Sequence, residues 1–143
     1  MAAQSGASTQ WQGDLAHGSG VTTPGSGAFD PVDVSWASRT ARAAGKTSPE
    51  ELLAAAHSSC YCMQLAHELA AAGTPPAQLS ATATIDFAPG EGVTSSLIVV
   101  TGSVPGIDQE TFAAAAASAG ENCPISGALK GSVEITVDAT LES

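Results

Sequence analysis

The sequence predicts an α+β domain in which two main helices pack on a mainly antiparallel sheet. A long segment rich in Leu, Ala and Met, residues 47–73, has the composition of a helix, and alternating apolar residues elsewhere have the spacing of strands. The expected order is strands, long helix, hairpin, helix and strand, without the regular β–α alternation of a parallel fold. Residues 1–143 are expected to form a single domain.

The N-terminal part is predicted to be a loose tail followed by short strands. The tail comprises the small, polar residues 1–8. Residues 9–14 and 18–23 are expected to pair as a hairpin. A third strand is indicated by apolar side chains that alternate with polar ones. These side chains are Val32, Val34 and Trp36.

A polar connection at residues 37–46 holds three of the four basic residues of the chain. They are Arg39, Arg42 and Lys46. With 4 basic and 14 acidic side chains, the formal net charge is −10, so nucleic acid and anionic membrane surfaces are not expected partners. The basic residues either bring positive charge to a site on the following helix or keep a loop soluble.

The long helix opens with a start signal and continues with a stripe of small apolar residues. Ser48 can cap it, and Pro49 suits its first position. Residues at three- and four-residue spacings are predicted to face the core. The residues of this stripe are Leu52, Ala55, Ala56, Ser59, Met63, Ala66 and Ala70.

The second half is predicted to be a hairpin, a helix and a closing strand. Residues 79–87 and 96–104 alternate as strands around a Pro- and Gly-rich loop. Asp108 is expected to cap an Ala-rich helix over residues 109–119, which Gly120 stops.

A short helical turn is expected after Pro124, and residues 132–141 are expected to close the chain as a strand. Aromatic residues make up only 4% of the chain, so its core is built from small side chains. A core shared between two chains is therefore a reasonable expectation.

Cysteine usage and the absence of targeting signals indicate a soluble, cytoplasmic protein. The three cysteines are an odd number, and a chain of this length does not need disulfide staples. Reduced, reactive or redox-cycling thiols are therefore expected rather than a secreted disulfide framework. No apolar run approaches a membrane span, and the N-terminus has neither a basic nor a hydrophobic region.

Cys60, in the middle of the long helix, is the central candidate for chemistry. It acts as a nucleophile only as a thiolate, and burial raises the pKa of a thiol. A reactive Cys60 therefore needs a cation from elsewhere. Arg39 or Arg42 is available, and Glu50 can hold the guanidinium in place through a bidentate contact. The alternative is that Cys60 is an inert core residue.

Helix geometry restricts how Glu50 and Cys60 can meet. Ten positions along one straight helix span about 15 Å, so the two residues of one helix cannot share a site. Either the helix begins after Glu50 and the chain bends back, or Glu50 comes from a second subunit.

The other two cysteines have different environments. Cys123 precedes Pro124 and so takes the N-cap position of the following turn, where backbone N–H groups can stabilise a thiolate. It is either a second redox thiol or a buried turn residue. Cys62 lies about 200° around the helix from Cys60 and is assigned to packing.

Metal binding and hydrolysis have less support. His57, Cys60, Gln64 and His67 share one helical face, and Cys123 can add a sulfur. These spacings match no common zinc pattern, so no metal or other cofactor is expected. A serine hydrolase is not indicated, because no G-x-S-x-G element is present.

Two motifs resemble the OsmC/Ohr family of thiol peroxidases. The first is TSPEEL at residues 47–52 with AAAH at residues 54–57, which leads to Cys60. The second is NCPIS at residues 122–126. The resemblance runs from about residue 11 to the C-terminus, and the position of His57 favours the OsmC branch over the Ohr branch.

The resemblance implies a cofactor-independent peroxidase that is an intertwined homodimer with two sites at the interface. Cys60 matches the residue that attacks an organic hydroperoxide or hydrogen peroxide. Cys123 matches the residue that resolves the sulfenic acid as a disulfide, which an external dithiol then reduces. Glu50 matches the acidic residue that orients a catalytic arginine. That arginine aligns best with Arg39, although a small shift in the loop exchanges it for Arg42.

From a different functional class, the alternative is a redox sensor or binding module without enzymatic activity. It would use the same pair, Cys60 and Cys123, as a switch. Cys62 is not part of the family pattern.

Overall fold

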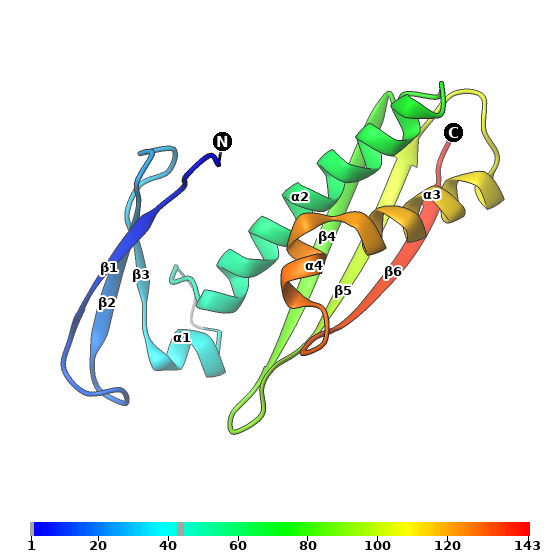
Figure 1. The fold of residues 1–143 in the computed structure, drawn as a ribbon. Helices are drawn as coiled ribbons and strands as arrows, with labels where there is room; N and C mark the ends of the chain where they lie inside the picture. Colours follow the sequence, from blue (N-terminus) through cyan, green and yellow to red (C-terminus); the bar gives the residue numbers. More distant parts are fainter. Residues whose placement is uncertain (1, 43–44) are drawn as a thin grey trace. The chain divides into compact units, whose positions relative to one another are not determined.

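The computed structural model describes residues 2–42 and 45–143 and has an α+β fold (Figure 1). The chain divides into two compact units, Met1–Leu52 and Leu53–Ser143. The boundary falls in the first turn of the long helix α2 (Pro49–Ala71), which therefore contributes to both units. That the whole chain forms one domain stays a prediction.

The first unit contains a three-stranded antiparallel sheet. Its strands are β1 (Ala7–Gln12), β2 (Ser19–Pro24) and β3 (Val32–Val34), in the order β1-β2-β3. Gln12 pairs with Ser19 at the end of the β1–β2 hairpin, which confirms the predicted hairpin. Because β1 begins at Ala7, this strand includes the end of the segment that was predicted to be a loose tail.

A short helix, α1 (Trp36–Thr40), replaces the end of the predicted third strand and the first part of the predicted polar connection. Ser35 and Ser38 form a capping box at its start: each side chain bonds the backbone N–H of the other, at 3.1 and 2.9 Å. A capping box usually has Glu or Gln at the third helical position. Because Ser38 stands there, the sequence did not suggest a helix start at Ser35. Arg39 therefore lies on a helix. Positions 43 and 44 of the predicted connection are outside the described residues.

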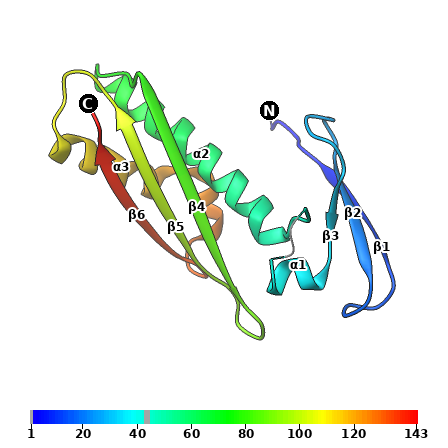
Figure 2. The same ribbon diagram turned by 180° about the vertical axis from the view of Figure 1, so that it is seen from behind.

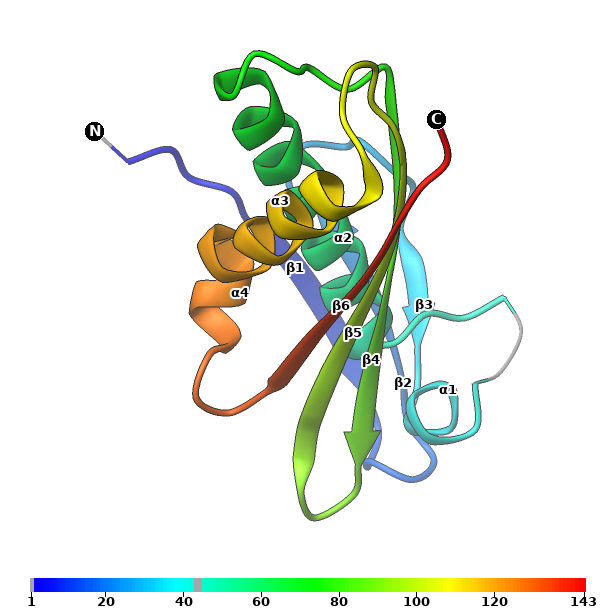
Figure 3. The same cartoon turned by 90° about the vertical axis from the view of Figure 1, so that its right-hand side faces the viewer.

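The second unit is a mixed sheet with helices on one face (Figures 2 and 3). Strand β4 (Gln78–Ala88) pairs antiparallel with β5 (Gly92–Ser103), and β6 (Glu134–Leu141) pairs parallel with β5. Helices α3 (Gln109–Asn122) and α4 (Pro124–Leu129) lie between β5 and β6 in sequence. They form the crossover that a parallel pairing requires.

The start of α2 is as predicted. The Glu51 backbone N–H donates to the Ser48 side chain at 3.1 Å, and Pro49 occupies the first helical position. Although α2 is long, none of the described helices is both long and apolar enough to cross a lipid bilayer.

The buried face of α2 is not the predicted stripe. Met63 of that stripe is 73% exposed, and Ala55, Ser59 and Ala70 are also exposed. The residues that α2 buries recur at every fourth position instead. In the part of α2 that belongs to the second unit they are His57, Tyr61, Leu65 and Leu69. Because α2 carries small residues on most of its sides, its larger side chains decide which face packs on the sheet.

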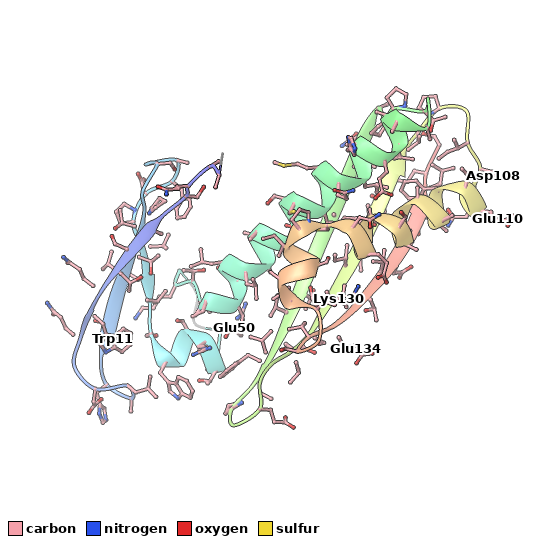
Figure 4. All side chains as sticks on the ribbon, viewed as in Figure 1. Trp11, Glu50, Asp108, Glu110, Lys130 and Glu134 are labelled. Atoms are coloured by element: carbon pink, nitrogen blue, oxygen red, sulfur yellow. The ribbon has the colours of Figure 1, made fainter. Side chains whose placement is uncertain are left out.

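Helix α3 begins as predicted but extends past Gly120. Asp108 lies at its start (Figure 4). It caps the helix by accepting from the Thr111 backbone N–H at 2.8 Å. The prediction that Gly120 stops the helix was wrong, since α3 continues to Asn122. A Cβ atom at position 120 would lie 2.9 Å from Cγ2 of Val137 on β6. Glycine is needed here for close packing of the helix on the sheet.

A second glycine, Gly102 on β5, makes room for an aromatic ring in the core. A Cβ atom at this position would lie 2.6 Å from two ring atoms of Phe112. We therefore expect Gly102→Ala to lower the free energy of unfolding by about 1–3 kcal/mol, the usual cost of overpacking. Urea denaturation measures this loss. Gly127→Ala in α4 is the control, because its Cβ would meet nothing within 4 Å. Equal stability of the two variants would contradict the prediction.

Candidate active site

Cys60 and Cys123 come together in the second unit. Cys60 lies on α2, and Cys123 is both the C-cap residue of α3 and the N-cap residue of α4. The Cys123 thiol is within hydrogen-bonding reach of the Cys60 sulfur. All three cysteines of the chain are described, and each is a free thiol.

The first turn of α4 directs a backbone donor at Cys60. Pro124 starts this helix, and the Ile125 backbone N–H donates to the Cys60 sulfur, which lowers the pKa of Cys60. The sequence suggested that this turn would stabilise a Cys123 thiolate instead. Cys123 does occupy the predicted N-cap position, but its side chain makes no capping hydrogen bond.

The balance of these effects raises the pKa of Cys60. Burial is the largest cause, and the neighbouring Cys123 thiol adds to it, while the Ile125 N–H acts in the opposite direction. A thiolate at neutral pH therefore needs a nearby cation. Lys130 is the one Lys or Arg in the sequence of this unit, and it lies 3.5 Å from a Glu121 carboxylate oxygen.

The first unit contains a partly buried ion pair between Arg39 and Glu50. Arg39 Nε and Nη2 each lie 2.8 Å from the same oxygen, Oε1 of Glu50. Both arginine nitrogens therefore contact a single carboxylate oxygen. The predicted bidentate contact would use both oxygens of Glu50. Glu50 is only 3% exposed, and within the described part of the chain its Oε2 has no hydrogen-bond partner. The Trp36 ring lies 6.0 Å from the Arg39 guanidinium carbon.

Arg42, the other candidate arginine, has a different contact. Its Nη1 donates to the Ser48 side chain at 3.0 Å, and its backbone is in the left-handed region at φ 57°. Of the two arginines that the sequence left open, Arg39 is the one paired with Glu50.

Glu50 lies in the first turn of α2 (Figure 4), and the same continuous helix carries Cys60. The alternative in which the helix begins after Glu50 is therefore wrong. Ten positions of an α-helix span about 15 Å, so Glu50 and Cys60 of one chain do not meet through a bend at the start of the helix.

Cys62 packs on the sheet, on a different side of α2 from Cys60. The Ala81 backbone on β4 hydrogen-bonds to its sulfur, and burial raises the pKa of the Cys62 thiol. The side chain is half-buried. This environment agrees with its assignment to packing.

His57, which the metal alternative placed among the ligands, is fully buried between two serines. Its Nδ1 lies 2.7 Å from Ser96 Oγ, and its Nε2 lies 2.8 Å from Ser126 Oγ. Both ring nitrogens are thus occupied. Among the residues that the structure describes, no three His, Cys, Asp or Glu side chains are placed to hold a metal ion. The two serine partners lie 39 and 69 positions away, so no local sequence signal could have identified them.

The fold and the thiol pair define a class of protein. It is an α+β protein in which Cys60 of a long helix, α2, meets Cys123 at the start of a short helix, α4. A family model described as OsmC-like protein matches residues 42–138. The Peroxiredoxin OsmC of Escherichia coli (strain K12) is 35% identical over 136 residues, which cover 93% of each chain. The chain belongs to the OsmC-like protein family.

Solved structures show the same fold. An organic hydroperoxide resistance protein OsmC from Legionella pneumophila superposes with a TM-score of 0.69 at 21% identity, over 97% of this chain and 99% of that one. OhrB of Bacillus subtilis superposes with a TM-score of 0.68 at 21% identity, over 94% and 98% of the two chains. These matches confirm the α+β fold that the resemblance implied.

Proposed function

We propose that the protein is a thiol-dependent peroxidase that reduces organic hydroperoxides and hydrogen peroxide. The observation that carries this proposal is the meeting of Cys60, Cys123 and the Ile125 N–H where α4 begins beside α2. Family membership supports it, since the curated relative from Escherichia coli is a peroxiredoxin and the similar structures include organic hydroperoxide resistance proteins.

The proposed reaction has three steps. The Cys60 thiolate attacks one oxygen of the peroxide, the O–O bond breaks, and the other oxygen leaves as an alcohol or water after taking a proton. The Cys123 sulfur then attacks the Cys60 sulfenic acid, which forms a Cys60–Cys123 disulfide and releases water. An external dithiol reduces this disulfide by exchange and is itself oxidised. No metal or other cofactor takes part, and the cytoplasm provides the reducing environment.

Steady-state consumption of cumene hydroperoxide with dithiothreitol tests the proposed activity. Continuous turnover is expected. A protein that oxidises once and then stops, although reductant is present, would be a redox sensor.

The role proposed for Arg39 is to activate the Cys60 thiolate and to bind the peroxide, with Glu50 holding the guanidinium. Burial raises the pKa of Cys60 and so opposes its ionisation. A cation near the sulfur would lower this pKa and favour the thiolate. Arg39 is suited to this role, because its side chain is 32% exposed while the carboxylate that anchors it is buried.

A second copy of the chain is proposed to bring the two parts of the site together. Glu50 and Cys60 lie about 15 Å apart along one helix, so Arg39 and Glu50 of one chain would serve Cys60 of another. Exposed apolar surface supports a homodimer. In the first unit every residue of β1 is exposed, and Trp11 and Phe29 are among the large exposed side chains.

Arg39→Ala is expected to slow oxidation of Cys60 about a hundredfold or more, because the thiol loses the cation that favours its charged form. Stopped-flow fluorescence with excess peroxide measures this rate. Arg42→Ala is the matched control and is expected to react like the wild type, since Arg42 contacts Ser48 and not Glu50. A large loss in Arg42→Ala instead would assign the role to the other arginine.

Mixing two inactive variants tests whether Arg39 acts across the dimer. Subunit exchange between Arg39→Ala and Cys60→Ser chains creates mixed dimers in which one intact Cys60 faces one intact Arg39. About a quarter of wild-type activity is expected from a random mixture, because half of the dimers are mixed and each has one complete site. No recovery after verified exchange would show that Arg39 does not act on the Cys60 of the other chain.

A further inference from the structure

His57 is a buried titratable residue that the proposed peroxidase mechanism does not use. It lies one turn before Cys60 on α2 and is fully buried. Burial lowers the pKa of His57, so the ring is neutral and has one donor and one acceptor nitrogen. Two serine hydroxyls match these nitrogens at 2.7 and 2.8 Å.

The two hydrogen bonds of His57 connect three elements of the second unit. Ser96 is a buried residue of β5, in the middle strand of the sheet. Ser126 is a buried residue of α4, three positions after Cys123. Since β5 is paired on both sides, its Ser96 fixes the position of the imidazole ring. The other nitrogen of the ring bonds to Ser126 of α4.

Helix α4 needs such an anchor, because it contributes directly to the thiol site but is short. It has six residues, Pro124–Leu129, and no side chain caps its start. Its first turn holds Cys123 and supplies the Ile125 N–H to the Cys60 sulfur. A small rotation of this helix would move both groups away from Cys60.

We propose that His57 is a positioning residue for the thiol pair: its hydrogen bond to Ser126 holds the first turn of α4 so that Cys123 and the Ile125 N–H face Cys60. Two contacts that lie one turn apart on α2 then join α2 to the α4 segment. One is His57 with Ser126, and the other is Cys60 with Cys123 and Ile125. This inference rests on the thiol pair of the proposed function and goes beyond it.

A purely structural role for His57 would affect stability but not the thiol pair in particular. Tyr61 on the next turn provides the matched control. It is fully buried on the same face of α2, and its hydroxyl donates to the Ala116 carbonyl of α3 at 2.8 Å. Tyr61→Phe therefore removes one buried hydrogen bond of similar length between α2 and a helix other than α4.

The test is the equilibrium of the Cys60–Cys123 disulfide with glutathione. In this exchange oxidised glutathione accepts two electrons from the dithiol, the protein disulfide forms, and two molecules of reduced glutathione are released. The equilibrium constant measures how well the fold holds the two sulfurs together. All variants carry Cys62→Ser, so that the third thiol cannot pair, and circular dichroism checks that each is folded.

We expect His57→Leu and Ser126→Ala each to lower this equilibrium constant about tenfold, as for the loss of one buried hydrogen bond. Tyr61→Phe should leave it within about twofold of the reference protein, because the lost bond goes to Ala116 of α3 and not to α4. The double variant of His57 and Ser126 should resemble the single variants, because both break the same contact. Ser126→Ala is the milder change and keeps the test open if His57→Leu does not fold.

The positioning role would be overturned if His57→Leu and Ser126→Ala matched the reference, or if Tyr61→Phe lowered the constant equally. It would also be overturned if the reference protein formed no Cys60–Cys123 disulfide in any glutathione mixture. Exchange with glutathione involves no peroxide. Peroxide turnover, measured separately, therefore decides the proposed function independently of this result.

Discussion

Cys60→Ser is expected to abolish peroxide turnover. Serine has nearly the volume of cysteine, but its hydroxyl does not ionise near neutral pH and cannot form a sulfenic acid. The replacement keeps the packing of α2 and removes the reacting atom. Peroxide consumption with dithiothreitol as reductant measures this loss. The rate should fall to that of the reaction without protein.

Cys62→Ser is the matched control for this prediction. The two cysteines are two positions apart on α2, but Cys62 contacts the Ala81 backbone on β4 and not Cys123. Its replacement should leave the turnover rate unchanged. Appreciable turnover in Cys60→Ser, or loss of turnover in Cys62→Ser, would contradict the assignment of Cys60 as the nucleophile.

Cys123→Ser is expected to stop the reaction after a single turnover. Cys60 still reacts with one equivalent of peroxide, because the nucleophile and the Ile125 N–H remain. Without the resolving thiol, the sulfenic acid persists and excess peroxide oxidises it further to sulfinic and sulfonic acids. Intact-mass analysis after stepwise addition of peroxide follows these products.

The wild type under the same treatment should accumulate the disulfide instead of the overoxidised forms. Sustained turnover by Cys123→Ser at the wild-type rate with dithiothreitol would contradict a resolving role for Cys123, unless the added dithiol itself reduces the sulfenic acid. Stepwise addition of peroxide without any added thiol removes that ambiguity, because no external thiol can then reduce the sulfenic acid.

Local signals predicted much of the secondary structure correctly. Ser48 and Asp108 cap helices as expected, because their side chains accept from a backbone N–H three residues ahead. The alternating patterns of β4, β5 and β6 were recognisable, since one face of the sheet is buried and the other is not.

The face of α2 was predicted wrongly for a physical reason. Alanine occurs on most sides of this helix, so the spacing of small apolar residues carries little information about burial. Tyr61, Leu65 and Leu69 lose more apolar surface to the core than alanines can. Their four-residue spacing was the better signal. Four residues of the predicted stripe are exposed instead, namely Ala55, Ser59, Met63 and Ala70.

The site was predictable only in part. The resemblance singled out Cys60, Cys123, Arg39 and Glu50, and the structure places the two cysteines together and the Arg and Glu together. Long-range contacts could not be seen in the sequence. The bond between His57 and Ser126 joins residues 69 positions apart, and only the packing of α4 against α2 creates it.

The most direct test of the two-cysteine mechanism is stopped-flow mixing of the reduced protein with cumene hydroperoxide, followed by intact-mass and peptide analysis. The expected result is rapid oxidation with a loss of two hydrogens per chain, mapped to a Cys60–Cys123 disulfide. Slow oxidation, or a disulfide that includes Cys62, would contradict it.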